Sequence, residues 1–341
     1  MPNAYLSGTG SYVPENVVTN NDLREQYGID TTHEWIVQRT GIEERRFAPE
    51  GWCSADLAVP ACENALESAG LTKNDIDMIV FCTLSPKHAF PGDGVYLMDK
   101  LGYSEMKRFI PAMDIRNQCS GFLYGLAAAG SMVQSGMVKN VLLVGAETHS
   151  AALDLTTRGR TVSSLFGDGA AAVVVSATDE DRGLRGWYLG SDGQYADKLC
   201  QKVWDMTQRP FMPQNEEGVG QSPPDFQWAY MEGRYVFKNA VERMVTSLMS
   251  ALWDQKIELS DIDLFCFHQA NMRINQKVAE VMGIPEEKLI HNIHRFGNTT
   301  AATIPLLLDE ANRTGRITRG SKVACTGFGS GFTWGTAILD W

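Results

Sequence analysis

The chain has 341 residues, 44% hydrophobic and 21% charged, which is the composition of a globular protein with a large core or two fused halves. No apolar run reaches the length that spans a bilayer, and a formal charge of −11 argues against general nucleic-acid binding. Seven cysteines, odd in number and unevenly spaced, favour free thiols in a reducing cytoplasm over a disulfide framework.

Strand-like and helix-like segments alternate along the first half of the chain. Residues 1–14 lack a basic start followed by an apolar block, so we expect a first strand there and not a signal peptide. The following segments predict helices over 55–69 and 122–134 and strands over 75–81, 109–115 and 141–145. This alternation is typical of parallel β-α-β units whose helices cover the sheet.

Three segments recur in the second half of the chain in the same order. The matched pairs are residues 5–12 with 188–195, 75–81 with 261–267, and 141–145 with 323–327. Ordered matches at nearly one offset (183, 186 and 182 residues) are hard to explain by chance. We therefore predict two pseudo-duplicated α/β halves, residues 1–175 and 176–341, with the site where their strand ends meet.

Residues 201–228 interrupt this pattern. The segment contains Pro210, Pro213, Pro223 and Pro224 among Gly, Gln and Asn residues, which predicts a long irregular loop. Such loops in compact domains are functional caps or disordered, and a linker between domains is the alternative. Helix-like sequence resumes at Val236 and the repeat continues, which favours a cap.

Cys119 is the cysteine that we predict to be chemically active. It lies between the predicted strand 109–115 and the predicted helix 122–134, at a sharp turn with the small neighbours Ser120 and Gly121. A helix N-terminus stabilises a thiolate and lowers the pKa of a cysteine. The other cysteines are assigned the ordinary role of small buried hydrophobes: Cys53, Cys62, Cys82, Cys200, Cys266 and Cys325.

Two polar residues of the second half complete the predicted site. His268 ends a predicted strand, where parallel-sheet proteins bind ligands. Asn298 lies in a turn before a helix, and a helix cap is its alternative role. Gly136 and Gly315 close the helices that follow the cysteine and the asparagine. Their interval of 179 residues also carries Cys119 onto Asn298, which predicts equivalent helix starts at a shared cleft.

These three side chains suit acyl transfer followed by carbon–carbon bond formation. A thiolate accepts an acyl group from a thioester. A second, carboxylated thioester then loses carbon dioxide, and N–H groups of a neutral histidine and an asparagine hold the enolate oxygen. The glycine-rich stretch 327–332 allows close backbone approach and an N–H donor for the oxyanion at Cys119.

Motifs spread almost from end to end of the chain carry a family resemblance. They comprise residues 8–14, 34–36, 39–42, 88–91, 114–121, 166–170, 268–271, 297–299 and 331–335. Together they resemble the β-ketoacyl-[acyl-carrier-protein] synthase III family of the thiolase superfamily. The resemblance implies a thiolase-like fold with five α-β-α-β-α layers. It also implies decarboxylative Claisen condensation of an acyl-CoA primer with malonyl-acyl carrier protein, through an acyl-cysteine.

The resemblance also implies a role for individual residues. Cys119 is the nucleophile, His268 and Asn298 are the decarboxylation pair, and the amides of Cys119 and Ser330 form the oxyanion hole. The implied binding residues are Trp35 stacking on the adenine of coenzyme A, Arg39 and Arg160 near its nucleotide, Asn271 in the substrate site, Phe90 in the acyl pocket of the other subunit of a homodimer, and Arg273 docking acyl carrier protein. Coenzyme A thioesters are substrates here, so no cofactor and no metal is expected.

Departures from the family leave alternatives open. Ser330 stands at a glycine position, and the chain is longer near Arg158, which could replace Arg160. The loop 201–228 is long and residues 116–118 are unusual, so primer length and branching stay open. The alternative reactions are condensation of two acyl-CoA chains without decarboxylation and acyl transfer to an amine or hydroxyl. A non-catalytic acyl-binding subunit is the non-enzymatic alternative.

Overall fold

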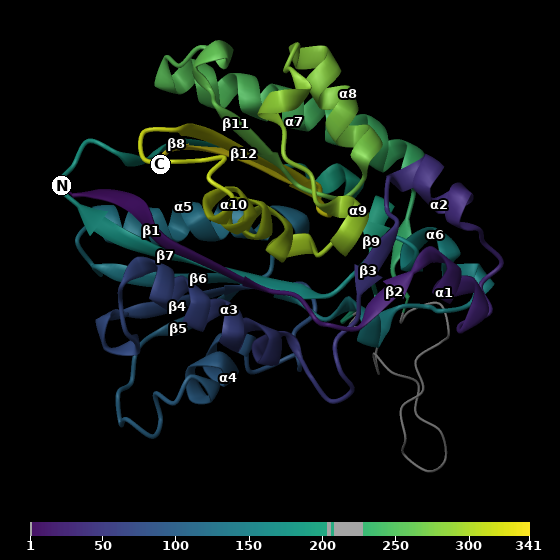
Figure 1. Ribbon diagram of the computed structural model, residues 1–341, viewed down its shortest axis with the longest axis horizontal. Helices are drawn as coiled ribbons and strands as arrows, with labels where there is room; N and C mark the ends of the chain where they lie inside the picture. The colour runs from purple at the N-terminus through teal and green to yellow at the C-terminus, as the bar shows by residue number, and fades with distance from the viewer. Residues whose placement is uncertain (1, 203–205, 208–227) are drawn as a thin grey trace.

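The described part of the chain, residues 2–202, 206–207 and 228–341 of a computed structural model, folds into alternating layers of helix and sheet (Figure 1). The strands are β1 Asn3–Tyr12, β2 Val17–Thr19, β3 Glu44–Arg46, β4 Met78–Cys82, β5 Ala112–Ile115, β6 Asn140–Glu147, β7 Gly169–Thr178, β8 Gly183–Ser191, β9 Leu199–Cys200, β10 Tyr230–Met231, β11 Leu264–Phe267, β12 Lys322–Gly329 and β13 Thr333–Asp340. The α-helices are α1 Asn20–Glu25, α2 His33–Thr40, α3 Ser54–Ala69, α4 Asp93–Lys100, α5 Gly121–Gln134, α6 Arg160–Ser163, α7 Gly233–Gln255, α8 Met272–Met282, α9 Ile293–Phe296 and α10 Thr303–Arg313.

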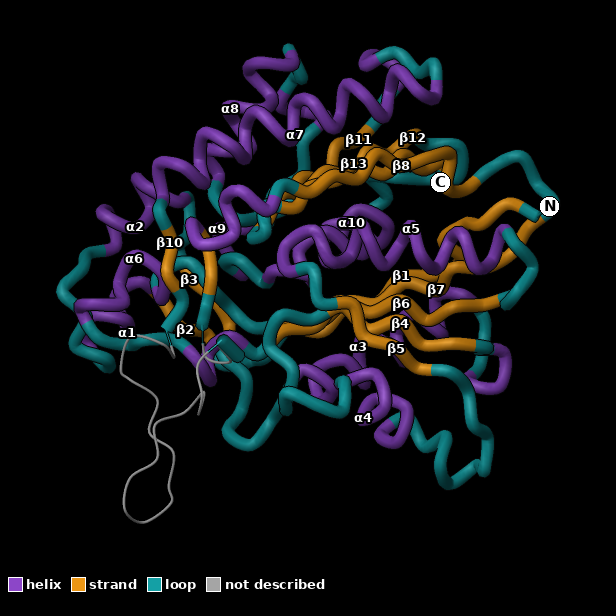
Figure 2. Tube along the Cα trace, turned by 180° about the vertical axis from the view of Figure 1, so that it is seen from behind, coloured by secondary structure: helices purple, strands orange, loops and turns teal. Residues whose placement is uncertain are grey.

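Two main sheets enclose a central pair of helices. The first sheet has the order β1-β7-β6-β4-β5 and the second has the order β11-β12-β13-β8. Helices α3 and α4 cover the outer face of the first sheet, α7 and α8 cover the outer face of the second, and α5 and α10 lie between the sheets (Figure 2). Helix α5 carries no charged residue, as expected for a helix buried on all sides. The five-layered thiolase-like architecture is confirmed.

Both sheets are mixed, where the sequence predicted parallel units. Strand β4 runs parallel to β5 and β6, and β11 runs parallel to β12. The pairs β6–β7, β1–β7, β12–β13 and β13–β8 are antiparallel. Strands β12 and β13 are joined by only three residues, 330–332, and so short a connection permits only an antiparallel pair.

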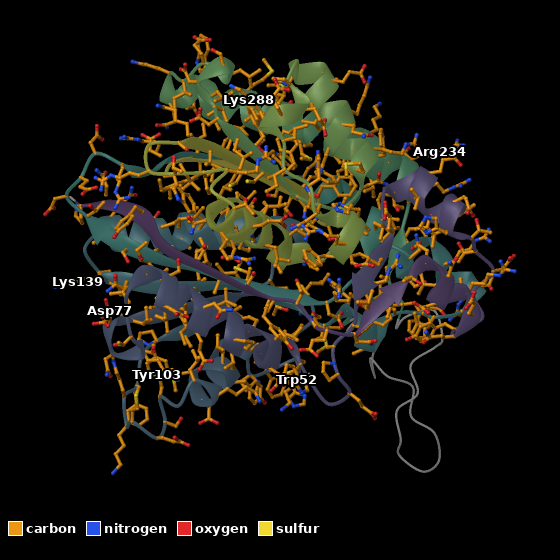
Figure 3. The ribbon with its side chains drawn as sticks, in the orientation of Figure 1. Trp52, Asp77, Tyr103, Lys139, Arg234 and Lys288 are labelled. Carbon is orange, nitrogen blue, oxygen red and sulfur yellow. The ribbon has the colours of Figure 1, made fainter. Side chains whose placement is uncertain are left out.

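The two halves agree in their hydrogen bonds as well as in strand order. Asp77 Oδ2 accepts from the Asn140 N–H at 3.0 Å, and Asp263 Oδ2 accepts from the Lys322 N–H at 2.8 Å. A single parallel bridge between Phe265 and Leu289 stands where β5 pairs in the first sheet. Figure 3 shows Asp77 beside Lys139, whose N–H donates to the same carboxylate at 2.8 Å. The duplication therefore extends to individual contacts.

The structure changes the register of that duplication near the site. Helix α5 has 14 residues and α10 has 11. When the glycines that follow the two helices are aligned, the helix starts are therefore out of step by three residues. The turn η2 (Gln118–Ser120) precedes α5 and the turn η8 (Thr300–Ala302) precedes α10. Their first residues both have positive φ, 47° and 48°. The structural counterpart of Cys119 is thus Ala301, and the equivalence with Asn298 was wrong.

Other predicted boundaries shift by smaller amounts. The predicted helices 55–69 and 122–134 are each extended by one residue at the start, whereas β5 begins three residues after the predicted 109. The boundary placed at 175/176 falls inside β7, and residues 179–182 connect the halves. Most of the loop predicted at 201–228 lies outside the described residues. Within the described ranges, no helix is long and apolar enough to cross a membrane.

Candidate active site

A cavity of about 340 Å³ lies where the two halves meet, and it brings the three predicted catalytic residues together. Its lining includes Cys119, His268 and Asn298. The walls are mostly apolar and include Leu199, Met231, Phe237, Met244 and Phe328. The arrangement gives an apolar chamber with few polar groups, in which hydrogen bonds to a bound carbonyl are strong.

Cys119 is presented to the cavity by the strained turn η2. Gln118 has a left-handed φ of 47°, which turns the chain sharply between β5 and α5. On the other side lies Gly329, where an added Cβ would sit 2.8 Å from the Cβ of Cys119. Only a glycine permits so close an approach between these two segments of backbone.

The thiol of Cys119 does not have the lowered pKa that its helix start predicted. Burial and, as a second cause, the negative charge of Glu147 together raise the pKa of Cys119 to about 12. The N–H of Cys119 itself and the Thr300 side chain act in the opposite direction. Desolvation of the thiolate therefore outweighs the favourable field of the helix N-terminus.

His268 presents an unpartnered nitrogen to the cavity. It follows β11, and its Nδ1 lies 2.6 Å from the hydroxyl of Thr303. Its Nε2 is buried without a hydrogen-bond partner among the described residues. Burial lowers the pKa of His268 to about 3, so the ring is neutral near pH 7. The Thr303 hydroxyl has two acceptors within reach, this Nδ1 and the Thr300 carbonyl at 3.0 Å, and when it donates to Nδ1 the proton of the neutral ring lies on Nε2 and faces the cavity.

Asn298 is held so that its amide nitrogen is the free side-chain donor. Its Oδ1 accepts from the N–H of Thr300 at 2.9 Å, and its main chain pairs with Leu165 and Gly167. The residue is 4% exposed. Because the oxygen is already used, the NH₂ group remains for a bound ligand.

Trp35 and two arginines form the mouth of the cavity. The guanidinium carbon of Arg39 lies 4.4 Å from the centroid of the Trp35 ring, and that of Arg160 lies 5.2 Å from it. Arg158 pairs instead with Asp154 at 2.7 Å. The structure thus places Arg160, and not Arg158, beside the tryptophan.

Asn271 lies between the cavity and helix α8. It caps α8 by accepting from the Arg273 N–H at 2.9 Å, and it donates to the carbonyl of Arg39 at 3.0 Å. Asn271 lines the cavity, whereas Arg273 is exposed on the first turn of the helix. This asparagine therefore has a structural role whether or not it binds a ligand.

Two other predicted site residues lie outside the cavity of this chain. Its described lining includes Gly329 but not Ser330, whose hydroxyl donates to the Leu199 carbonyl. Phe90 is 85% exposed and lies on the surface. The roles given to these two residues stay predictions.

Sequence reasoning missed four polar residues behind the cavity: Glu147, His149, Thr300 and Thr303. Glu147 accepts from the N–H groups of Leu84 at 3.0 Å and Ala301 at 3.3 Å, and burial raises its pKa to about 7. Glu147 ends the buried strand β6 and His149 lies two residues beyond it, so both have the strand-end position that singled out His268. Across the described ranges, no group of three or more His, Cys, Asp or Glu could hold a metal ion.

Comparison with known proteins places the chain in a family. The family pattern described as 3-oxoacyl-[acyl-carrier-protein] synthase III matches residues 113–193, and its C-terminal pattern matches 252–341. A β-ketoacyl-[acyl-carrier-protein] synthase III of Vibrio parahaemolyticus is 41% identical over 334 residues, 98% of each chain. One of Laribacter hongkongensis is 40% identical over 342 residues, 100% of each chain.

Solved structures agree with this assignment. The crystal structure of 3-oxoacyl-[acyl-carrier-protein] synthase III from Aquifex aeolicus superposes with a TM-score of 0.87 at 36% identity, covering 99% of this chain and 100% of that one. Sequence and fold agree over the full length of both proteins. The chain belongs to the 3-oxoacyl-[acyl-carrier-protein] synthase III family of condensing acyltransferases.

Proposed function

We propose that this enzyme condenses an acyl-CoA primer with a malonyl thioester, malonyl-acyl carrier protein, and releases carbon dioxide and a β-ketoacyl thioester. The observation that carries the proposal is the shared cavity of Cys119, His268 and Asn298, with the buried Nε2 of His268 lacking a partner among the described residues. The names of the relatives support the same reaction class.

The first half-reaction takes place at the sulfur. The Cys119 thiolate attacks the thioester carbonyl of the primer, coenzyme A leaves as its thiolate, and an acyl-cysteine remains. The N–H of Cys119 stabilises the transient oxyanion, with the N–H of Ser330 as the second expected donor. The apolar walls that include Phe237, Met244 and Phe328 suit a hydrocarbon-rich substrate.

The second half-reaction takes place at the histidine and the asparagine. The thioester oxygen of the malonyl group accepts from His268 Nε2–H and Asn298 Nδ2–H. The bond to the carboxylate breaks, carbon dioxide leaves, and the electron pair forms an enolate held by the two donors. The enolate carbon attacks the acyl-cysteine carbonyl, and the Cys119 thiolate leaves. Both donors are neutral, so neither needs a proton-transfer step before decarboxylation.

Coenzyme A and the carrier protein would enter through the cationic mouth. Arg39, Arg234 and Arg273 are exposed there on α2, α7 and α8 (Figure 3 labels Arg234) although the whole chain carries a formal charge of −11. The adenine of coenzyme A stacks on Trp35 while Arg39 and Arg160 move to its phosphates. An acidic carrier protein binds at Arg273 in the next step.

A mass measurement and a gas measurement test the proposed reaction. The purified protein is mixed with acyl-CoA primers of different lengths, and a covalent acyl adduct is sought on Cys119 by peptide mass spectrometry. Malonyl-acyl carrier protein is then added, and carbon dioxide and a β-ketoacyl product are expected. An amide or ester product would point to acyl transfer, and the absence of any adduct and of carbon dioxide with every primer would exclude the proposal.

We also propose a homodimer in which Phe90 closes the acyl pocket of the partner subunit. An aromatic side chain that is 85% exposed supports such a contact. Light scattering should give twice the monomer mass for the wild type. The variant Phe90→Asp should shift the mass towards the monomer, whereas the exposed Trp253→Asp should not, since it lies on α7.

A further inference from the structure

His149 is a second histidine of the site, and the proposed reaction gives it no task. It begins the short helix η3 (His149–Ala152), two residues beyond the end of β6, and it is 7% exposed. Its Nε2 lies 2.7 Å from the hydroxyl oxygen of Thr300. Its ring packs on Phe166, with 4.7 Å between the centroids, and Phe166 lines the cavity. The imidazole is therefore fixed behind the wall of the cavity.

Thr300 connects this histidine with all three predicted catalytic residues. Its N–H donates to Asn298 Oδ1 at 2.9 Å, and its carbonyl oxygen lies 3.0 Å from the Thr303 hydroxyl oxygen, which in turn lies 2.6 Å from His268 Nδ1. Its side chain hydrogen-bonds to Cys119. Thr300 is fully buried with a φ of 48°, a costly conformation for a β-branched residue. The fold maintains this strain at the centre of the site.

The position of the proton on the Thr300 hydroxyl determines which group donates and which accepts in the contacts from His149 through Thr300 to Cys119. The hydrogen bond with Thr300 favours the charged form of Cys119, and because a thiolate can only accept, the hydroxyl proton points at the sulfur when the thiolate forms. A hydroxyl has a single proton, and its oxygen must then accept from His149. Burial lowers the pKa of His149 to about 3, so the ring is neutral and carries its one proton on Nε2.

We propose that His149 is a positioning residue for the nucleophile: its Nε2–H fixes the Thr300 hydroxyl so that this hydroxyl donates to the Cys119 sulfur and stabilises the thiolate. The inference rests on the proposed role of Cys119. The other charged or titratable groups on the elements around the sulfur are Glu147 at the end of β6, whose charge acts on Cys119, Arg116 after β5, whose charge interacts with Glu147, and His268 after β11, which lines the cavity. The negative charge of Glu147 opposes the thiolate. His268 is neutral, so it cannot stabilise the thiolate as a cation if the hydrogen bond from Thr300 is lost.

Alkylation of Cys119 tests the inference without either substrate. Iodoacetamide reacts with the thiolate, and peptide mass spectrometry separates Cys119 from the half-exposed Cys53 and Cys200. The rate at Cys119 is followed from about pH 7 to about pH 9, below its pKa, where the rate is proportional to the thiolate fraction. The variants are His149→Leu, which removes the donor, and His149→Gln, which retains an N–H at a similar reach.

His149→Leu should slow alkylation about tenfold at every pH, which corresponds to a thiol pKa raised by about one unit. His149→Gln should recover most of that rate. Thr300→Val should slow the reaction as much as His149→Leu, and Thr300→Ser should not. The control His291→Leu removes another largely buried histidine outside the cavity lining and should leave the rate unchanged.

Equal alkylation rates in folded His149→Leu and wild type would overturn the inference. If His149→Leu does not fold, the alkylation rates of Thr300→Val and Thr300→Ser are compared instead. Equal rates in these two variants would also overturn the inference. Failure of the proposed reaction gives a different result. The alkylation rate at Cys119 would still depend on His149 and Thr300, but no acyl adduct and no carbon dioxide would form.

Discussion

The two halves of this molecule share a fold but present different residues at equivalent turns. In the first half, the turn η2 places Cys119 in the cavity. In the second half, the counterpart of Cys119 is Ala301, whose N–H donates to Glu147 at 3.3 Å. The turn η8 thus supports the site through its backbone. The side-chain donor of this half, the amide of Asn298, lies three residues before Ala301 in the chain. Duplication determines where the chain approaches the cavity, and single residues determine the chemistry.

Burial also acts differently on the two halves. It raises the pKa of Cys119 to about 12 and lowers the pKa of His268 to about 3, so both groups are held neutral near pH 7. The thiol must lose a proton before it can react, whereas the imidazole can donate its Nε2–H as it stands. The first half therefore contains the pH-sensitive step and the second half the insensitive one.

Removing the sulfur of Cys119 should produce the largest effect, because it should abolish acylation in the first half and leave decarboxylation in the second half. Cys119→Ala should form no acyl adduct and should lower condensation by more than about 10³-fold. Because His268 and Asn298 remain, slow release of carbon dioxide from the malonyl thioester should continue. Intact mass and carbon dioxide assays on one preparation measure the two activities. Loss of both would show that the halves do not act separately.

Removing a donor in the second half should give the opposite pattern. His268→Ala and Asn298→Ala should each lower decarboxylation by about 10²- to 10³-fold, because each removes one hydrogen bond to the enolate oxygen. The acyl adduct on Cys119 should still form at a similar rate. If either variant also blocked the adduct, that residue would belong to the acylation step as well.

A methyl group at the backbone contact of the halves should have a smaller effect. Gly329→Ala places a Cβ 2.8 Å from the Cβ and 3.0 Å from the N of Cys119, so the nucleophile must move. Acylation should slow by about tenfold, and overpacking should cost about 1–3 kcal/mol of stability. Gly327→Ala is the matched control in the same strand, since the atoms nearest to its added Cβ, the His268 Cβ and the Leu123 Cδ1, are both 3.4 Å away. Equal losses in both variants would refute the specific role of Gly329.

The pH dependence should show the smallest and most detailed difference. Acylation should accelerate about tenfold per pH unit above about pH 5, because the pKa of Cys119 lies near 12. The slope should decrease near pH 7, where Glu147 ionises and opposes the thiolate. Decarboxylation by the acylated enzyme should stay flat from about pH 5 to about pH 8, because His268 is neutral throughout. Rapid-quench assays should measure the rate of each half-reaction against pH. The same pH dependence in both half-reactions would contradict this prediction.

The same pKa shift predicts how acid affects folding. The pKa of His268 is about 3 in the folded state and about 6.5 when unfolded, so below pH 6.5 only the unfolded chain takes up the proton. Stability should fall by up to about 1.4 kcal/mol per pH unit from this group between pH 6.5 and pH 3. Urea unfolding of wild type and His268→Gln at pH 7 and pH 5 measures the difference. An equal loss in both proteins would contradict the neutral, buried ring.

Patterns of local sequence predicted the layers and the cavity, because helix and strand periodicities and strand-end polarity are local signals. The helix 122–134 and the strand ending before His268 are examples. The register of the duplication was not predictable, since it depends on α10 being three residues shorter than α5. The raised pKa of Cys119 was missed because it depends on burial by distant segments. The contact of His149 with Thr300 joins residues 151 positions apart, which no local pattern reveals.

The position of β13 in the second sheet has a consequence for folding order. This strand lies between β12 and β8, so residues 183–191 can join their sheet only after residues 333–340 have arrived. Contacts between segments so distant in sequence form late, because closing long loops costs entropy before the pairing repays it. Gly329, next to Cys119, ends β12 just before this last strand. We therefore expect the reactive thiol to be enclosed late in folding, so that acylation of Cys119 would report when a refolding chain is complete.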